Sequence, residues 1–246
     1  MVTLQLTPHQ NDAFQKLKDF TKAADSRAFI LRGYAGTGKT TLLGHYASWL
    51  DESGYKPVLL ATTGRAAKVL QMKTGIEAKT LHSCIYQFDE LDGMEEQTTG
   101  GQLTMQFGLR RHPRYEEPPV YIVDEASMIP NTALTGGQVA QFGSGHILMD
   151  FLEFTEGRKI IFVGDPCQLP PVSEETFSPA LSPRYLRDQY KVAVQYAELT
   201  EIIRQGADSE ILTLAGRFRS DIVAERYVKW PKVGVPSGKQ AHLLPN

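Results

Sequence analysis

The chain has 246 residues, with 26 Lys and Arg against 28 Asp and Glu, so its formal net charge is −2. This balance excludes overall basicity as a basis for nucleic-acid binding, and any polyanion site must be a local patch. Cys84 and Cys167 match no metal-ligand spacing and indicate no disulfide framework. With neither a membrane-spanning apolar run nor a leader after Met1, we expect a soluble, cytoplasmic protein with no membrane partner.

The first half of the chain alternates strand and helix patterns. Thr7 can cap a helix with apolar positions at helical spacing, and residues 27–33 ("RAFILRG") are typical of a buried strand. The next predicted elements are a helix over residues 40–54, a strand over 56–63 and a helix over 64–75. Two later strands, in 119–127 ("PVYIVDEAS") and 158–166 ("RKIIFVGDP"), run into acidic residues. This alternation predicts an α/β domain with a parallel sheet flanked by helices.

The alternation breaks between residues 85 and 118. This segment is too polar for a core, and "TTGG" at 98–101 can join two extended arms. We interpret 85–118 as an inserted β-hairpin, with a disordered loop as the alternative. Residues 1–84 and 119–220 then form the main domain, and 221–246 a linker.

The stretch "GYAGTGKT", residues 33–40, matches the phosphate-binding pattern G-x-x-x-x-G-K-[ST]. Its glycines let backbone N–H groups surround phosphate oxygens, Lys39 can reach the terminal phosphates, and the Thr40 hydroxyl can ligate Mg²⁺. The stretch follows a strand and precedes a helix, whose N-terminus favours anions. We therefore expect nucleoside triphosphate and Mg²⁺ as cofactors, bound by Gly33, Ala35, Gly36, Thr37, Gly38, Lys39, Thr40 and Thr41.

Two further strand ends carry candidate catalytic groups. Asp124 would hold Mg²⁺, and the adjacent Glu125 could accept a proton from an attacking water. Gln168, in "FVGDPCQLPPV" (162–172), could reach the γ-phosphate or that water. This set favours hydrolysis over phosphoryl transfer to a second substrate, which argues against a small-molecule kinase. A solvated acidic loop and a simple turn residue are the alternatives for these two sites.

These motifs, in this order, resemble the first motor domain of superfamily one helicases, in the 5′-to-3′ branch that includes RecD-like and Dda-like enzymes. The family's "GDPxQLPPV" stretch is matched over 164–172, and its "LTEIxRQ" stretch over 199–205. The resemblance implies a RecA-like P-loop NTPase fold that uses ATP. It also implies that Gln10 reads adenine and that Arg204 contacts the γ-phosphate and stabilises the transition state. Lys39, Glu125, Gln168 and Arg204 are then the catalytic residues.

Two further matches imply single-stranded DNA contacts. The family's "PTGRAA" loop corresponds to 62–67, with Thr62 in place of the usual Pro, and its "TIH" element to 80–82. The resemblance assigns DNA binding to Thr62, Thr63, Arg65, Thr80 and His82. Such groups would hold phosphates without reading bases, although hydroxyls in these positions also serve as helix caps.

The resemblance gives the inserted hairpin the role of a pin that parts duplex strands. Four basic residues beside it could contact phosphates or simply form a solvated face: Arg110, Arg111, His112 and Arg114. Phe107 or Tyr115 could stack on a base or pack into the core.

The sequence as a whole predicts the N-terminal motor domain of an ATP-dependent 5′-to-3′ DNA helicase or single-stranded DNA translocase. Its expected partners are single-stranded DNA, fork DNA and a replication or repair protein, and we expect a monomer. Since the resemblance stops at Gln205, we expect a fragment with weak activity and little unwinding alone, or else a naturally short protein. The alternative function is a nucleotide-gated module that binds a partner in DNA replication or repair.

Overall fold

A computed structural model describes residues 5–87, 94–99, 102–130, 140–168, 178–201 and 203, and two short strands further on. Its centre is a six-stranded sheet in which every neighbouring pair is parallel. In spatial order the strands are β3 (Ala78–Thr80), β2 (Lys56–Ala61), β6 (Pro119–Asp124), β8 (Lys159–Gly164), β1 (Ala28–Gly33) and β9 (Val194–Leu199). The predicted RecA-like fold class is confirmed.

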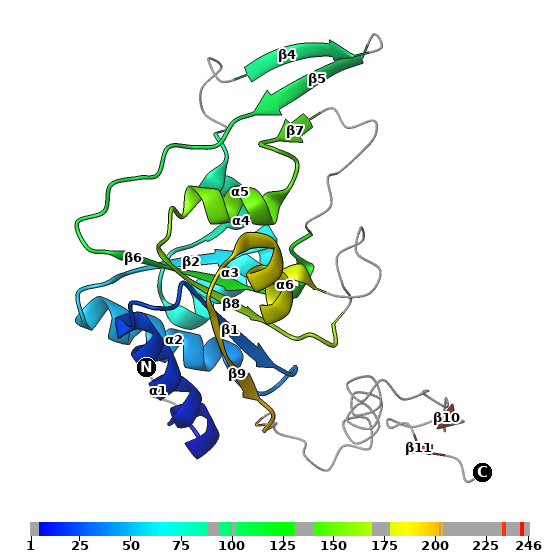
Figure 1. Ribbon diagram of the computed structural model, residues 1–246. Helices are drawn as coiled ribbons and strands as arrows, with labels where there is room; N and C mark the ends of the chain where they lie inside the picture. Colours follow the sequence, from blue (N-terminus) through cyan, green and yellow to red (C-terminus); the bar gives the residue numbers. More distant parts are fainter. Residues whose placement is uncertain are drawn as a thin grey trace.

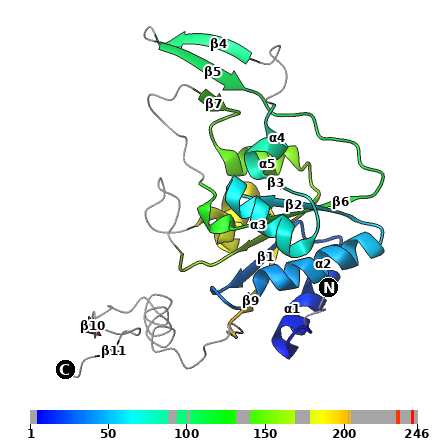
Figure 2. The ribbon, with the colours of Figure 1, turned by 180° about the vertical axis from the view of Figure 1, so that it is seen from behind.

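Helices cover both faces of this sheet. One face carries α1 (Pro8–Lys22), α2 (Lys39–Glu52) and α3 (Gly64–Thr74), and the other carries α4 (Leu81–Ile85), α5 (Ile147–Phe154) and α6 (Pro183–Tyr190). Figures 1 and 2 show α1 and α2 on one side of the sheet, with α4 and α5 on the other. Strand residues point alternately to the two faces, so Phe29 and Leu31 join one apolar core while Ala28 and Ile30 join the other.

The first helix begins where the sequence predicts. The Thr7 side chain accepts a hydrogen bond from the Gln10 backbone, and the Gln10 side chain accepts one from the Thr7 backbone. This reciprocal capping box satisfies two helix-end donors, and Pro8 supplies the fixed φ that suits the first turn. The capping box fixes Gln10 at the start of α1.

An antiparallel pair of strands occupies the segment where a hairpin is expected. β4 (Met94–Thr99) pairs with β5 (Gln102–Phe107), and the short strand β7 (Ala140–Phe142) adds to β5 in parallel. Figure 1 shows this pair projecting beyond α5. Within the expected linker, β10 (Val233–Gly234) pairs with β11 (His242–Leu243); the rest of 221–246 lies outside the described residues. The domain boundaries stay a prediction.

The sequence analysis did not anticipate β3, α4, β7, α5, α6 or β9. β3 has three residues and β9 alternates partly exposed with buried positions, so neither shows a long apolar run. In the part of the chain that the structure describes, no helix is both long and apolar enough to cross a bilayer.

Candidate nucleotide and DNA site

Three of the predicted site segments lie at one edge of the sheet. The phosphate loop follows β1, Asp124 ends β6, and Gln168 lies four residues after β8. β8 is hydrogen-bonded to both β1 and β6. Because the carboxyl ends of parallel strands meet at the same edge of a sheet, these three segments converge there.

The phosphate loop has the backbone shape that its glycines permit. Gly36 and Gly38 have φ angles of 87° and 78°, which residues with a Cβ rarely adopt. A Cβ on Gly38 would also lie 2.4 Å from Nε2 of Gln10. Lys39 Nζ donates to the backbone oxygens of Gly33, at 2.6 Å, and Tyr34, at 3.1 Å. Lys39 thus lies within the loop, where a phosphate would compete for its ammonium group.

Gln10 is tied to this loop. Its side chain is 3% exposed, and its Nε2 donates to the backbone oxygens of Thr37, at 3.2 Å, and Gly38, at 3.4 Å. Its Oε1 accepts from the Thr7 backbone at 3.0 Å. The position beside the loop agrees with a nucleotide role, and its reading of adenine stays a prediction.

The acidic pair stands in two different environments. Asp124 is 9% exposed, and its Oδ1 accepts from the Glu125 backbone at 3.0 Å. Burial, and secondarily the Glu125 charge, raise the pKa of Asp124 to about 6. Glu125 adopts a left-handed backbone with φ of 54°, a strained conformation for a residue with a side chain. The chain therefore turns sharply between the two carboxylates.

Gln168 sits in a turn built by Asp165. The Gln168 backbone donates to the Asp165 backbone oxygen at 3.1 Å, and the Cys167 backbone donates to Asp165 Oδ1 at 2.9 Å. The Gln168 side-chain oxygen accepts from the buried Ser127 hydroxyl at 3.4 Å. Ser127 follows the acidic pair in the 3₁₀ turn η2 (Ala126–Met128), so the second and third motifs are in contact. Residues 169–172 of the third motif lie outside the described residues.

The segment after β9 reaches back to the phosphate loop. The Ile203 backbone donates to the Gly36 oxygen at 2.9 Å, and the Thr7 hydroxyl donates to Glu201 Oε2 at 3.1 Å. Arg204, the next residue after Ile203, lies outside the described residues, and its catalytic role stays a prediction. The sequence analysis missed Ile203 and Glu201 as parts of the site, although both lie within the matched "LTEIxRQ" stretch.

Two of the predicted DNA-binding residues are helix caps. Thr63 caps α3 by accepting from the Ala66 backbone at 3.2 Å, and Thr80 caps α4 by accepting from the Ser83 backbone at 3.1 Å. Capping leaves the first N–H groups of each helix at the carboxyl edge of the sheet, where they could face phosphates. The capping alternative is therefore confirmed for both, and their DNA contacts stay predictions.

The other predicted DNA residues differ in exposure. Arg65 is exposed, and the Thr62 hydroxyl lies 3.9 Å from the sulfur of Met128. His82 is half-buried beside the rings of Tyr86 and Phe142, and burial lowers its pKa. His82 is therefore best described as a neutral group that could donate or accept a hydrogen bond.

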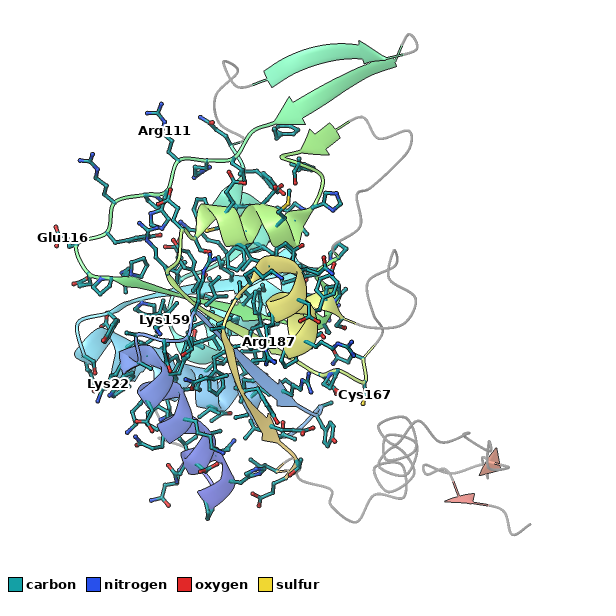
Figure 3. The ribbon with its side chains drawn as sticks, in the orientation of Figure 1. Lys22, Arg111, Glu116, Lys159, Cys167 and Arg187 are labelled. Atoms are coloured by element: carbon teal, nitrogen blue, oxygen red, sulfur yellow. The ribbon has the colours of Figure 1, made fainter. Side chains whose placement is uncertain are left out.

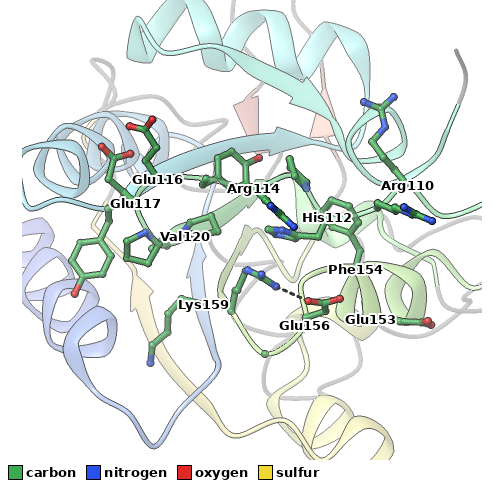
Figure 4. A pocket seen from close by; sticks show the side chains of 18 of the residues that line it. Arg110, His112, Arg114, Glu116, Glu117, Val120, Glu153, Phe154, Glu156 and Lys159 are labelled. Atoms are coloured by element: carbon green, nitrogen blue, oxygen red, sulfur yellow. Dashed lines mark hydrogen bonds and ion pairs between the residues drawn. The ribbon is translucent and has the colours of Figure 1, made fainter.

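The four basic residues beside the hairpin line a different hollow. A cavity of about 1050 Å³ is lined by the amino ends of β6 and β8, with Val120 and Lys159 among its residues (Figure 4). The phosphate loop follows the carboxyl end of β1, at the opposite edge of the sheet. His112 there lies within hydrogen-bonding distance of the Tyr121 hydroxyl, at 2.5 Å, and its ring packs near Phe154. Arg111 points outward (Figure 3). The remaining two, Arg110 and Arg114, also line the cavity.

The oxygen groups present suit Mg²⁺. Among the described residues, no group of three or more His, Cys, Asp or Glu could enclose a metal ion. Mg²⁺ bound with nucleotide phosphates commonly takes only one or two protein oxygens. The Thr40 hydroxyl and the buried Asp124 carboxylate are donors of this kind. A bound cation would favour the deprotonated form of Asp124.

Comparison with known proteins places this architecture in a family. A family model described as an AAA domain matches residues 5–230. The chain therefore belongs to this AAA domain family, and the helicases among its relatives agree with the predicted superfamily one motor domain. The 5′-to-3′ direction stays a prediction.

Its relatives include helicases and conjugation proteins. The chain is 29% identical to the ATP-dependent RecD2 DNA helicase of Deinococcus radiodurans over 78% of its length. It is 31% identical to the ATP-dependent DNA helicase Pif1 of Bdellovibrio bacteriovorus over 69% of its length. The conjugal transfer protein TraA of Agrobacterium fabrum is 27% identical over 76% of the chain.

The chain is much shorter than these relatives. It spans 22% of the RecD2 protein, 34% of the Pif1 protein and 13% of the TraA protein. The crystal structure of the Pif1 helicase from Candida albicans has the same fold, with a TM-score of 0.55 and 22% identity. That match covers 93% of this chain and 50% of the other.

Proposed function

We propose that this chain is the N-terminal, ATP-hydrolysing part of a DNA motor that moves 5′-to-3′ along single-stranded DNA. The observation that supports this most strongly is the convergence of the phosphate loop, the acidic pair and Gln168 on the ends of adjacent strands. The carboxyl edge that holds them also holds Thr63 and Thr80, which the resemblance assigns to DNA.

In this proposal the loop residues bind and the acidic residues drive hydrolysis. Lys39 exchanges its bonds to Gly33 and Tyr34 for the β- and γ-phosphates. Thr40 and Asp124 would hold Mg²⁺, which supplies charge stabilisation to the phosphates when bound. Glu125 accepts a proton from the water that attacks the γ-phosphorus, and the bond from that phosphorus to the bridging oxygen breaks. ADP and phosphate leave.

The contact between Ser127 and Gln168 can couple the nucleotide site to the segment predicted to contact DNA. Gln168 would sense the γ-phosphate or the water, and the 3₁₀ turn η2 next to it places Met128 beside Thr62. Loss of the γ-phosphate would thereby alter the surface that holds DNA.

ATP hydrolysis with and without single-stranded DNA tests this proposal. The chain should bind ATP, and the intact protein that contains it should hydrolyse ATP faster with single-stranded DNA. Lys39→Ala should abolish that stimulated hydrolysis, because no other side chain in the loop can neutralise the phosphates. Lys56→Ala, which removes an exposed lysine at the amino end of β2, is the matched control. ATP hydrolysis whose rate is the same with and without single-stranded DNA, and which persists in Lys39→Ala, would contradict the proposal.

We extend the proposal to fork DNA as substrate, with the β4–β5 hairpin parting the strands, and to a monomeric, cytoplasmic protein that works with a replication or repair partner. Unwinding by the chain alone should be weak, since the resemblance implies that ATP lies between two motor domains. Sedimentation of the purified chain and unwinding of a forked duplex measure these points.

A further inference from the structure

A buried carboxylate lies beneath the root of the β4–β5 hairpin. Asp150, on α5, is 1% exposed. Its Oδ2 accepts from the Tyr86 hydroxyl at 2.7 Å and from the Ser144 backbone at 3.1 Å, and its Oδ1 accepts from the Ser144 hydroxyl at 2.6 Å. A buried charge is costly unless donors surround it, so these bonds hold Tyr86 and Ser144 firmly to α5.

Tyr86 is the point where the chain enters the inserted segment. It directly follows α4 and forms an isolated antiparallel bridge with Leu109, where the chain leaves the hairpin. The Arg110 backbone donates to the Ile85 oxygen at 2.7 Å, beside the same bridge. Both connections of the hairpin therefore meet beside Tyr86, whose hydroxyl donates to the Asp150 carboxylate.

A backbone hydrogen bond also joins the end of the hairpin to the segment that holds Asp150, and its donor is Gly143, just before Ser144. Its backbone donates to the oxygen of Phe107, the last residue of β5, at 2.8 Å. Gly143 has a φ of 48°, and a Cβ there would lie 2.2 Å from Asp150 Oδ2. A glycine is required at this position because the carboxylate and the hairpin root approach so closely.

Aromatic rings connect this root to a predicted DNA-binding residue. Phe142 stacks on Phe107, with ring centroids 4.9 Å apart and planes inclined by 16°. The Phe142 and His82 rings pack in a T-shaped arrangement, with centroids 5.6 Å apart and planes inclined by 80°. His82 and Tyr86 lie on and just after the same five-residue helix, α4. Thr80 and His82, which are predicted to contact DNA, therefore lie at the start of α4, and Tyr86 at the hairpin root follows its end.

We propose that Asp150 is a positioning residue that fixes the direction of the β4–β5 hairpin relative to α4. The role in strand separation rests on the proposed function: pulling a strand past Thr80 and His82 would press the duplex against a hairpin that cannot swing aside. The geometric claim itself requires neither DNA nor ATP.

Pulsed electron–electron double resonance tests this geometry by measuring the distance between the hairpin and the sheet domain to which α4 belongs. Spin labels attached through ketone-bearing residues at Thr98, on β4, and Asp51, on α2, leave the native cysteines in place. Asp150→Asn and Tyr86→Phe should each widen the label distance distribution at least about twofold, because a loosened local unit samples more states. Tyr46→Phe removes another buried tyrosine hydroxyl bond, to Thr21 between α1 and α2, and should leave the distribution unchanged.

Thermal unfolding of each variant separates positioning from general loss of stability. Tyr86→Phe keeps the ring and its packing, so it remains informative if Asp150→Asn does not fold. A distribution as narrow as the wild type in folded Tyr86→Phe and Ser144→Ala would overturn the proposal, as would equal widening in Tyr46→Phe. In the intact protein, Tyr86→Phe should lower the rate of fork unwinding at least about fivefold more than it lowers hydrolysis stimulated by single-stranded DNA. Equal losses would contradict the role in strand separation, and absence of stimulated hydrolysis in the wild type would instead contradict the proposed function.

Discussion

The hydroxyl of Ser127 donates to the side-chain oxygen of Gln168 across 3.4 Å, which joins the end of β6 to the loop after β8. Ser127 lies three residues after Asp124, so the same short turn holds a magnesium candidate at one end and the Gln168 contact at the other. Through this contact the orientation of Gln168 depends on the position of the acidic pair.

Ser127→Ala should lower the ATP hydrolysis rate with little change in ATP affinity. A hydrogen bond of this kind contributes about 1 kcal/mol, which corresponds to roughly a fivefold loss in rate. Ser48→Ala is the matched control, because its hydroxyl also donates to a single acceptor, the Gly44 oxygen, but at an exposed position on α2. An unchanged rate for Ser127→Ala, measured at saturating ATP, would mean that Gln168 is oriented without it.

Asp124 should make magnesium-dependent nucleotide binding sensitive to pH. Its carboxyl has a pKa of about 6 without a cation, so below that pH a proton competes with Mg²⁺ and binding should weaken up to about tenfold for each pH step of one. Asp124→Asn should bind more weakly at pH 8 and lose this dependence. Titration of Mg²⁺ at fixed ATP between pH 5 and 8 measures both; a flat profile in the wild type would contradict the assignment.

The raised pKa of Asp124 also affects folding stability. An ion-paired acid has a lowered pKa and stabilises the folded state as pH rises, whereas Asp124 has the reverse effect. The folded state keeps its proton up to about pH 6, whereas the unfolded carboxyl loses it near the ordinary 3.8. Stability from this group is therefore lost as pH rises between those values, by up to about 3 kcal/mol. Asp124→Asn should be more stable than the wild type at pH 7 by chemical denaturation, and less different at pH 4.

Thr63 offers a way to separate helix capping from DNA binding. Thr63→Asp keeps an N-cap acceptor, so the unfolding free energy should change by less than about 0.5 kcal/mol. The added negative charge, at the carboxyl edge of the sheet where DNA is predicted to bind, should weaken single-stranded DNA binding about tenfold. Ser182→Asp adds the same charge at the cap of α6, across the sheet from α3, and should bind DNA normally. Equal weakening by both variants would point to net charge alone.

Gln10→Ala should reduce the preference for ATP over GTP. The resemblance assigns adenine recognition to this side chain, and loss of one such contact would weaken ATP binding about tenfold. GTP binding should change less, by the amount that the contacts to Thr37 and Gly38 contribute to loop order. If ATP and GTP affinities fall by the same factor, Gln10 supports the loop and does not read the base.

The sequence predicted those parts of the molecule whose signal is local. The phosphate loop, the "DEAS" turn and the strands before them are contiguous patterns, and the structure places them in the expected contexts. Phe107 was left open between stacking on a base and packing, and it packs on Phe142. That choice depends on a residue 35 positions along the chain, which no local pattern contains.

The parts that could not be predicted depend on contacts between distant segments. Asp150 has an ordinary place in an amphipathic helix, and only the fold brings it under Tyr86, 64 residues earlier. Ile203 looks like a helix or strand residue until the chain after β9 returns to Gly36. The left-handed backbone at Glu125 is also invisible in sequence, because nothing but the turn around it requires that conformation.

The most direct test of the account is ATP hydrolysis by Glu125→Gln, with ATP binding measured in parallel. The amide keeps the size of the side chain but cannot accept the proton of the attacking water, so hydrolysis stimulated by single-stranded DNA should fall at least about 100-fold. ATP affinity should stay within about threefold of the wild type, because Lys39 and the loop provide binding. Hydrolysis at the wild-type rate in Glu125→Gln would contradict the assignment of this edge of the sheet as a hydrolytic motor site.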